Sequence, residues 1–331
     1  MSRAADLVSV LETTESLAIV CHDNPDPDCL ASALALEAIA TDHDVDEVTI
    51  TYGGEISHQQ NRAFVNMLEI SLQSIENTAI DDYDCIGFVD HSQPGANTEL
   101  PASVTPDIVV DHHPGDPVEA IVADVRVAIG ATATIFVEYL ADLEIELTTR
   151  LASALLFALH RERLDFVREP TRREYEAALA VYPDADLGTL DQLYGSAFSP
   201  ETLDAIGRAI AMRERRDSTL VANVGETVET DALPQAADYL LNVEGIDTVL
   251  AFGVVRDAIR LSARSIDPRI HIGETLDTAF DDLGAVGGHH DMAGGRIELA
   301  QFDDAVHDAL LEVVDAQLTR RFFAAMDLDD E

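Results

Sequence analysis

Acidic residues and histidines follow the short apolar runs of this chain, and that placement limits the folds it can adopt. Three such runs end in side chains of this kind: residues 17–20, 85–89 and 107–110. Short, continuously apolar runs are typical of strands buried in a parallel sheet. Open α/β sheets bind their ligands beyond the carboxyl ends of the strands. The sequence therefore predicts an α/β fold with a parallel sheet and a polar site at one edge of it.

The side chains that follow these runs are ones that divalent metals bind. His22, Asp26 and Asp28 stand at spacing i, i+4, i+6 in HDNPDPD, and Asp90 and Asp111-His112-His113 follow the later runs. Imidazoles and carboxylates without thiolates suit ions such as Mn²⁺. Clusters from separate strands can converge on a metal pair, a recurring device for displacement at phosphorus. We interpret the pattern as a metal-dependent phosphoesterase, against the simpler alternative that these aspartates only form turns and cap a helix.

Local signals around the first cluster predict a loop followed by a helix. Pro25 and Pro27 disfavour helix within HDNPDPD, and the alanine- and leucine-rich stretch from Ser32 onward predicts a helix. Cys21 and Cys29 flank this motif; a ligand role is open to them, although burial as small apolar residues is favoured. A further apolar segment, 154–159, leads into polar residues and fits either a strand or a helix.

Charge sets a second constraint. The chain has 63 acidic and 20 basic residues, a net charge of −43, and every basic residue is arginine. Such a charge makes the compact state repel itself at low salt, and concentrated salt screens that repulsion. Because the acids are spread along the chain, we interpret them as an adaptation to a salt-rich cytoplasm rather than as one acidic binding surface. High salt also weakens phosphate contacts, which disfavours long duplex nucleic acids as partners.

The texture of the sequence predicts two domains. Residues 1–185 alternate strand-like and helix-like segments, 186–217 read as a helical connector, and 218–331 contain strands of a smaller sheet separated by helices. Strands are expected at 219–222, 248–253 and 259–264, and helices at 233–243, 276–283 and 302–323. The start of the chain is polar and its apolar runs are short, so neither a signal peptide nor a membrane span is expected.

With these motifs in view, the chain resembles the DHH-family phosphoesterases. This group holds RecJ-type exonucleases, nanoRNases (oligoribonuclease/phosphoadenosine-phosphate phosphatases) and cyclic-di-AMP phosphodiesterases. HDNPDPD resembles the first motif of the family, FVDH the second and VVDHHPGD the third, while GGHHDMAGG resembles the glycine-rich signature of the companion DHHA1 domain. The resemblance covers nearly the whole chain. It implies a parallel-sheet DHH domain with helices on both faces, a smaller α/β DHHA1 domain that binds substrate, and a cleft between them.

The resemblance also implies roles for particular residues. His22, Asp26 and Asp90 would hold one metal, and Asp28, Asp90, His112 and an acid from the fourth motif would hold the other, with Asp90 bridging. Asp111 would orient a histidine, and His113 would face the scissile phosphate. The fourth motif departs from the family pattern. With Phe166 in register Glu162 is the counterpart, and Asp165 is the alternative.

The second domain offers candidates for substrate binding. The glycines of GGHHDMAGG let backbone amides approach an anion, and Arg264 offers a planar fork for phosphate. Helix packing and turns are the simpler explanation for these glycines. Two positions depart from the family pattern, Val286 at an expected glycine and Met292 at a small residue. The candidates, with a further arginine that enters a polar loop of the first domain, are Arg264, Gly287, Gly288, His289, His290 and Arg62.

Three functions fit these predictions. The first is hydrolysis of short oligoribonucleotides or small nucleotides such as phosphoadenosine phosphate, with two Mn²⁺ ions or with Mg²⁺ or Co²⁺ in their place. The second is a cyclic-dinucleotide phosphodiesterase. The third is a nucleotide-binding or sensor protein with weak catalysis, which Glu162 in the fourth motif allows. The expected partners are short single-stranded RNA or DNA, mononucleotides or dinucleotides, with no membrane, and a homodimer stays open.

Overall fold

A computed structural model describes most of the chain, and it divides into two compact units, Met1–Ala197 and Phe198–Glu331. The described residues are 3–163, 165–167, 170–195, 199–298 and 307–328, with the backbone alone for 307–314. Residue 164 of the fourth motif and residues 302–306 of the predicted last helix lie outside them. No helix among the described residues is both long and apolar enough to cross a membrane.

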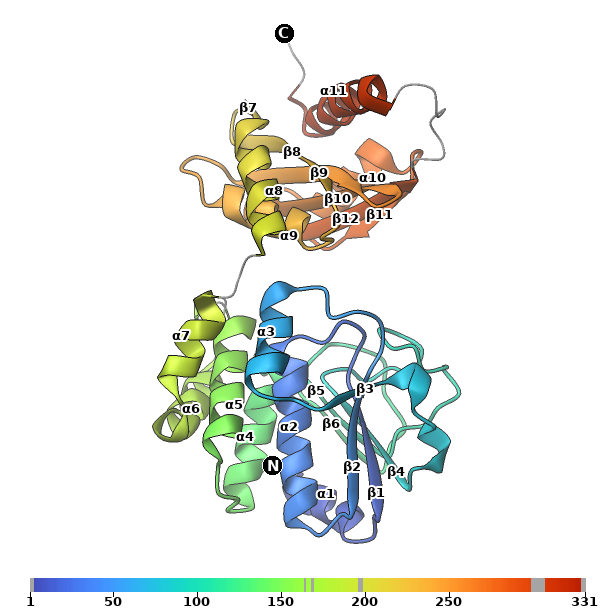
Figure 1. Cartoon of the computed structure of the whole chain (residues 1–331), viewed down its shortest axis with the longest axis vertical. Coiled ribbons are helices and arrows are strands. Elements are labelled where there is room, and N and C mark those ends of the chain that lie inside the picture. Colours follow the sequence, from blue (N-terminus) through green and yellow to red (C-terminus); the bar gives the residue numbers. More distant parts are fainter. Residues whose placement is uncertain (1–2, 164, 168–169, 196–198, 299–306, 329–331) are drawn as a thin grey trace. The chain divides into compact units, whose positions relative to one another are not determined.

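The first unit is built on a six-stranded parallel sheet (Figure 1). Its strands, in chain order, are β1 (Ser16–Val20), β2 (Glu47–Tyr52), β3 (Leu72–Ser74), β4 (Cys85–Val89), β5 (Ile108–Asp111) and β6 (Val122–Val125). Their spatial order is β3-β2-β1-β4-β5-β6. The chain thus builds outward from β1 in one direction and then returns to β4 on the other side of it. That reversal between β1 and β4 creates a topological switch point, where sheets of this class bind ligands.

Helices cover both faces of this sheet, but the type of helix differs between the two faces. One face carries α-helices: α1 (Ala4–Leu11), α2 (Pro27–Asp42), α3 (Gln59–Met67), α4 (Thr132–Asp142), α5 (Thr149–Glu162), α6 (Arg172–Val181) and α7 (Leu187–Gly195). The opposite face packs against loops and the short 3₁₀ helices η1 (Ile75–Asn77) and η2 (Ile80–Asp82); η3 (Tyr182–Asp184) follows α6. α2 is buried on nearly all sides because it lies among α4, α5 and the sheet. Its apolar residues surround most of the helix rather than forming one stripe, which is typical of such a central helix.

Two local predictions are refined by the structure. The helix expected from Ser32 begins earlier, at Pro27, because proline at the first helical position lacks only an N–H that would have had no partner there. The segment 154–159, which fitted either a strand or a helix, belongs to α5, where the side chain of Thr148 caps the helix through the backbone N–H of Leu151.

The second unit has a six-stranded mixed sheet with helices on both faces. Its strands are β7 (Glu214–Arg216), β8 (Thr219–Thr227), β9 (Thr248–Val255), β10 (Ala258–Ser265), β11 (Ala285–Gly288) and β12 (Met292–Glu298), in the order β11-β12-β10-β9-β8-β7. Its helices are α8 (Pro200–Ala211), α9 (Ala232–Leu241), α10 (Ile272–Phe280) and α11 (His307–Ala325). The predicted connector therefore contributes α7 to the first unit and α8 and β7 to the second.

Candidate active site

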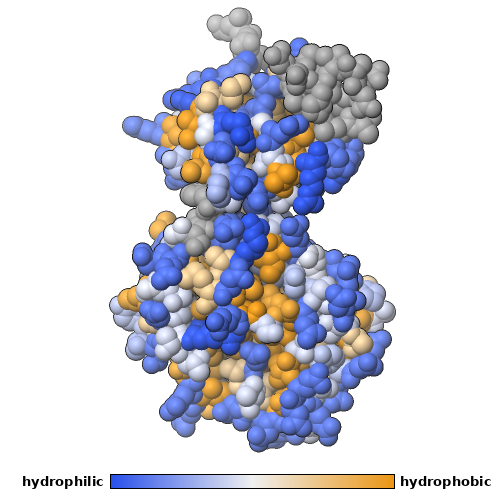
Figure 2. All heavy atoms as spheres, in the orientation of Figure 1, coloured by the Kyte–Doolittle hydropathy of each residue, from blue (hydrophilic) through white to orange (hydrophobic). Residues whose placement is uncertain are grey.

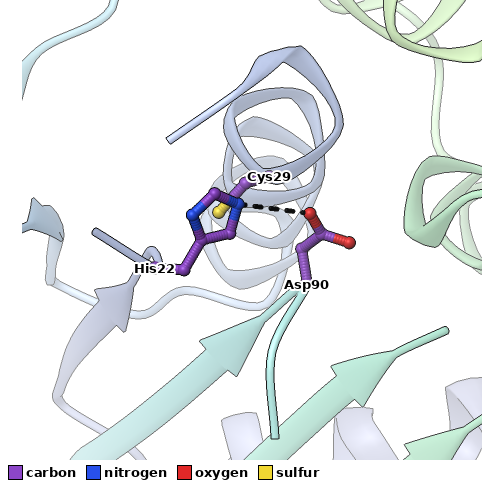
Figure 3. A group of neighbouring side chains, drawn as sticks. All are labelled: His22, Cys29 and Asp90. Carbon is purple, nitrogen blue, oxygen red and sulfur yellow. Dashed lines mark ion pairs between the residues drawn. The ribbon is translucent and has the colours of Figure 1, made fainter. Parts of the chain in front are cut away.

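The switch point of the first sheet brings His22 and Asp90 together. His22 follows β1 and Asp90 follows β4, and these strands pair in parallel as far as Val20 and Phe88. The Nε2 atom of His22 lies 3.5 Å from Oδ2 of Asp90 (Figure 3). Asp90 has a left-handed backbone, with φ of 63°, which is uncommon outside glycine and asparagine. Such backbone strain clusters at functional sites.

Cys29 is the third side chain shown in Figure 3, at the start of α2 beside His22 and Asp90. One donor atom from each of these residues lies within 4.8 Å of the others. The Sγ atom donates to the carbonyl of Val89 at 3.5 Å, and burial raises the pKa of the thiol well above its ordinary value. A neutral, enclosed thiol fits the prediction that Cys29 packs as a small apolar side chain.

His112 completes a cluster of donors around Asp90. Its Nε2 atom lies 3.7 Å from Oδ1 of Asp90 and 3.8 Å from Oδ2 of Asp28. These distances exceed those of hydrogen bonds and suit donors that surround a common ion. In both His112 and His22 the other ring nitrogen, Nδ1, faces a backbone carbonyl, of Ile129 and Asp23 respectively. Metal-ligating histidines are oriented by the same kind of contact.

Asp26 and Asp28 have structural contacts as well as positions near the cluster. Asp26 caps α2, because its Oδ1 atom accepts from the backbone N–H groups of Asp28 and Cys29. Asp28 accepts from the backbone N–H groups of Thr132 and Ala133, both at 2.8 Å, at the start of α4. Helix N-termini stabilise carboxylates in this way. Asp26 therefore caps a helix and also lies near the cluster, so the helix-cap and metal-ligand interpretations of this residue do not exclude each other.

Thr132 is a site residue that the sequence did not reveal. Its hydroxyl donates to Oδ1 of Asp90 at 2.7 Å, and the side chain is fully buried. The signal available in the sequence was weak: a Gly-Ala-Thr run before an apolar helix, 42 residues from Asp90. The hydroxyl of Thr132 thus fixes the carboxylate of Asp90, and the backbone N–H groups at the start of α4 fix the carboxylate of Asp28.

We expect Thr132→Val to lower kcat/KM for the natural substrate about ten- to a hundred-fold, the usual cost of removing a group that orients a metal ligand. Valine keeps the shape of threonine but leaves Asp90 without its hydroxyl donor. Mn²⁺ affinity by calorimetry and hydrolysis rates check this. Thr134→Val is the matched control, since Thr134 is equally buried on the same helix and its hydroxyl contacts Glu174 rather than Asp90. Equal losses in both variants would contradict the role of Thr132.

His113 and Asp111 form a pair at the open side of the cluster. Nδ1 of His113 lies 2.9 Å from Oδ1 of Asp111, and its side chain is 53% exposed whereas that of Asp111 is buried. The hydrogen bond with Asp111 is the main cause that raises the pKa of His113 to about 9. This shift favours the protonated ring, and Asp111 fixes its orientation.

The structure places Glu162, rather than Asp165, near the cluster. Burial, followed by the charges of Asp26 and Asp90, raises the pKa of Glu162 to about 7. Asp165 instead accepts a hydrogen bond from the hydroxyl of Tyr194 and pairs with His160 at 3.2 Å. Glu162 lies at the end of α5, so the orientation of that helix determines which acid of the fourth motif reaches the site.

The donor set fits a divalent metal. Burial and the charge of Asp90 raise the pKa values of Asp26 and Asp28, because several carboxylates crowd one buried region. In addition, Oδ2 of Asp111 and Nε2 of His91 are buried without a hydrogen-bond partner among the described residues. A cation would relieve the repulsion between the carboxylates. His22, Asp90, His112 and Asp28 are the donors whose separations suit such a cation, and Asp26 and Glu162 lie near enough to add their charges.

Two other polar residues of the first unit have structural contacts. Arg62 donates to the backbone carbonyl of Ile56 and to Oε1 of Gln59, so it closes its own loop before α3. The ring of His91 stacks on Phe88, with centroids 4.6 Å apart, and burial lowers the pKa of this histidine to about 4. His91 therefore packs against the sheet.

In the second unit, a groove of about 640 Å³ collects most of the predicted substrate-binding residues. Arg264, Gly287, Gly288 and His289 line it. His290 is not among the lining residues; its ring packs against His271, with centroids 5.3 Å apart. Nε of Arg264 donates to Asp238 at 2.7 Å and Nη1 to Ser262 at 3.2 Å, which aims the guanidinium.

Only one of the two glycines at the start of the loop is required by packing. A Cβ on Gly288 would lie 2.4 Å from backbone atoms of the next strand, whereas one on Gly287 would meet nothing within 4 Å. Gly287 therefore leaves space in the groove itself, which favours close approach of a ligand. The departure at Val286 does not alter the groove, because Val286 packs into the core on the other face of the sheet.

Comparison with known proteins identifies the family. The model of the DHH family, N-terminal domain, matches residues 16–159, and the DHHA1 domain model matches residues 216–316. An uncharacterized protein of Methanocaldococcus jannaschii is 36% identical over 97% of this chain and 67% of its own length. The chain belongs to the DHH family. The enzyme class predicted from the sequence, a metal-dependent phosphoric ester hydrolase, is the class of this family.

Two further relatives extend the comparison. The cyclic-di-AMP phosphodiesterase PdeA of Listeria monocytogenes is 25% identical over 94% of this DHH chain and 49% of its own length. The chain thus spans about half the length of that enzyme. An exopolyphosphatase-related protein from Bacteroides fragilis superposes with a TM-score of 0.73 at 14% identity, covering 97% of this chain and 98% of that one. This last likeness confirms the α/β fold with its two sheets.

Proposed function

We propose that this DHH-family chain is a two-metal phosphoesterase of the manganese type that hydrolyses short oligonucleotides or small nucleotides such as phosphoadenosine phosphate. The observation that carries the proposal is the convergence of His22, Asp28, Asp90 and His112 at the switch point, with Nε2 of each histidine directed at a carboxylate. When bound, a metal pair supplies an activated water and positive charge opposite the phosphoryl oxygens. Hard carboxylate and imidazole donors favour Mn²⁺, with Mg²⁺ or Co²⁺ as substitutes.

The residues of the chain divide the remaining work. Asp90 would bridge the two metals, with its carboxylate fixed by Thr132. His113, protonated and oriented by Asp111, would donate through Nε2 to a non-bridging phosphoryl oxygen and stabilise the charge that develops there. Glu162 would complete the second metal site. Arg264 and His289 would bind the part of the substrate that does not react.

A cyclic-dinucleotide phosphodiesterase is the second candidate function, favoured by the relative PdeA, which aligns with 94% of the chain. A panel of short RNAs, phosphoadenosine phosphate and cyclic-di-AMP, assayed with Mn²⁺ in molar KCl, tests both proposals. Preferential hydrolysis of linear substrates supports the first function, and preferential hydrolysis of cyclic-di-AMP supports the second. Binding without turnover of any substrate would instead favour a sensor protein.

We expect Arg264→Ala and His289→Ala to damage hydrolysis of nucleotides much more than hydrolysis of bis(p-nitrophenyl) phosphate. This generic ester lacks the groups that the two residues would bind. Losing a charge-assisted phosphate contact costs about 1.5–3 kcal/mol, or roughly ten- to a hundred-fold in kcat/KM. His112→Ala is the comparison variant and should disable both substrates. Equal losses on both substrates for Arg264→Ala would place that arginine in the chemical step or in the fold.

A further inference from the structure

Helix α6 presents apolar side chains to solvent. Tyr175 and Leu179 lie on α6 and Tyr182 begins η3 directly after it, with 48%, 72% and 53% of their surfaces exposed. Their spacing of i, i+4 and i+7 places them on one face of the helix, opposite the residues that it buries. We call these three residues the α6 stripe.

The α6 stripe contrasts with the rest of the chain, which has 63 acidic and 20 basic residues. Figure 2 shows hydrophilic residues over most of the visible surface of the described part of the chain. α6 itself has two arginines and two glutamates, so it has no net charge. Contiguous exposed apolar surface marks an interaction site, and two copies of a chain with net charge −43 repel each other least where the local charge is zero.

The α6 stripe is complementary to itself. Most homodimers are related by a two-fold axis, which brings the same surface of both copies together. An axis midway between Tyr175 and Tyr182 makes the two α6 helices antiparallel and passes beside Leu179. Tyr175 of each copy then lies opposite Tyr182 of the other, and the two Leu179 side chains meet at the centre.

Charges at the two ends of the stripe also complement each other in this arrangement. Arg172 begins α6 with its side chain 88% exposed, and its ion pair with Glu176 at 2.7 Å joins two exposed groups and is weak. The same axis places Arg172 beside Asp184 and Asp186 of the other copy, which are exposed where η3 ends. Each dimer repeats this contact twice. A parallel pair of helices would instead place arginine opposite arginine, which disfavours that orientation.

Tyr175 is held in position before any partner binds. Its ring stacks on that of Phe166, with centroids 4.9 Å apart, and its hydroxyl donates to the carbonyl of Phe166 at 3.4 Å. An ordered aromatic side chain loses little conformational entropy on binding, and such residues anchor many interfaces. Phe166 belongs to the fourth motif, so the stripe adjoins that part of the first unit.

We propose that the α6 stripe is the centre of a two-fold interface between two copies of this chain, with the α6 helices antiparallel. The interface is small, because standard ones bury about 800 Å² per partner and a helix of 10 residues offers less. We therefore expect a reversible dimer that dissociates on dilution. Molar salt favours it, since a Debye length of about 3 Å confines the repulsion between the copies to charges in contact.

Sedimentation of the full chain in molar KCl, from micromolar to submillimolar protein, tests the interface. The wild-type mass should rise from one chain toward two as the concentration increases. Leu179→Asp should keep the mass of one chain over the same range, because a dimer would bury two carboxylates against each other. Leu203→Asp is the matched control: Leu203 is 60% exposed on α8, outside the stripe, and its replacement should leave the dimer intact.

Cysteine cross-linking tests the register separately. Cys21, Cys29 and Cys85 are buried, so an introduced surface thiol is the one that oxidises. Leu179→Cys should form a disulfide-linked dimer on treatment with diamide, because the axis brings the two positions within disulfide reach. Arg172→Cys should not, since this position lies about 10 Å along the helix from the axis in each copy.

Three results would overturn the inference: a wild-type chain that keeps the mass of one copy throughout, a Leu179→Asp variant that still dimerises, or equal cross-linking of the two cysteine variants. The first result would mean that another part of the chain or a different protein covers the stripe. Because Leu179 is 72% exposed, its replacement should leave the circular dichroism spectrum unchanged, which separates loss of the dimer from loss of the fold.

Discussion

Asp90→Asn is expected to lower kcat/KM by about a thousand-fold or more while leaving the fold unchanged. Asp90 is the carboxylate around which His22, His112 and the hydroxyl of Thr132 converge, at 3.5, 3.7 and 2.7 Å. Asparagine keeps the size of the side chain but removes the charge that would bridge two metals, and a metal ion contributes several kcal/mol to phosphoryl chemistry. Asparagine also tolerates the left-handed backbone at this position, so the substitution tests chemistry rather than folding.

Asp165→Asn is the matched control for this experiment. Asp165 also has a left-handed backbone, with φ of 55°, but its carboxylate contacts Tyr194 and His160 outside the cluster. Hydrolysis of short RNA with Mn²⁺ in molar KCl, together with near-ultraviolet circular dichroism, provides the readout. A folded Asp90→Asn protein with full Mn²⁺-dependent activity would refute the two-metal proposal. Inactivation by Asp165→Asn instead would move the fourth-motif ligand from Glu162 to Asp165.

The sequence predicted the site residues that follow strands better than it predicted the contacts that hold those residues in position. His22, Asp90 and His112 follow apolar strands, and parallel strands present their carboxyl ends at one edge, so their convergence followed from local pattern and topology. The hydrogen bonds of Asp28 to the start of α4 connect residues 104 and 105 positions apart. No local pattern encodes a pairing of that length, and Thr132 was missed for this reason.

Two questions that the sequence left open, the structure of segment 154–159 and the choice between Glu162 and Asp165, share a physical cause. The segment 154–159 is apolar on every side, and a fully buried helix and a buried strand look alike in such a short run. The choice between Glu162 and Asp165 depended in turn on this helix, which ends at Glu162 and leaves Asp165 to turn toward Tyr194. In the second unit, Arg264 was visible as a motif residue.

The largest expected effect on stability comes from salt. We propose that the net charge of −43 is an adaptation to a cytoplasm rich in salt, and we expect the chain to lose its structure as KCl is lowered from molar to about a tenth molar. Over that range the Debye length grows from about 3 to about 10 Å, so repulsion between neighbouring surface carboxylates becomes effective. Circular dichroism and gel filtration across the titration measure the midpoint.

A charge-reduced variant tests whether screening is the cause. Asp81 and Asp82 are exposed in the short helix η2, which precedes β4, whereas Asp90 follows that strand. Neither aspartate has a side-chain hydrogen bond among the contacts described. Replacing both with asparagine should shift the unfolding midpoint to lower KCl, because less charge then needs to be screened.

Sucrose is the solution control: it favours the compact state by exclusion from the protein surface, yet it supplies no ions. A melting temperature that stays constant from molar to tenth-molar KCl would show that the acidic surface is not a salt adaptation. If sucrose restored the fold in low salt as fully as KCl, the stabilisation would come from solvent exclusion rather than from screening of the carboxylates.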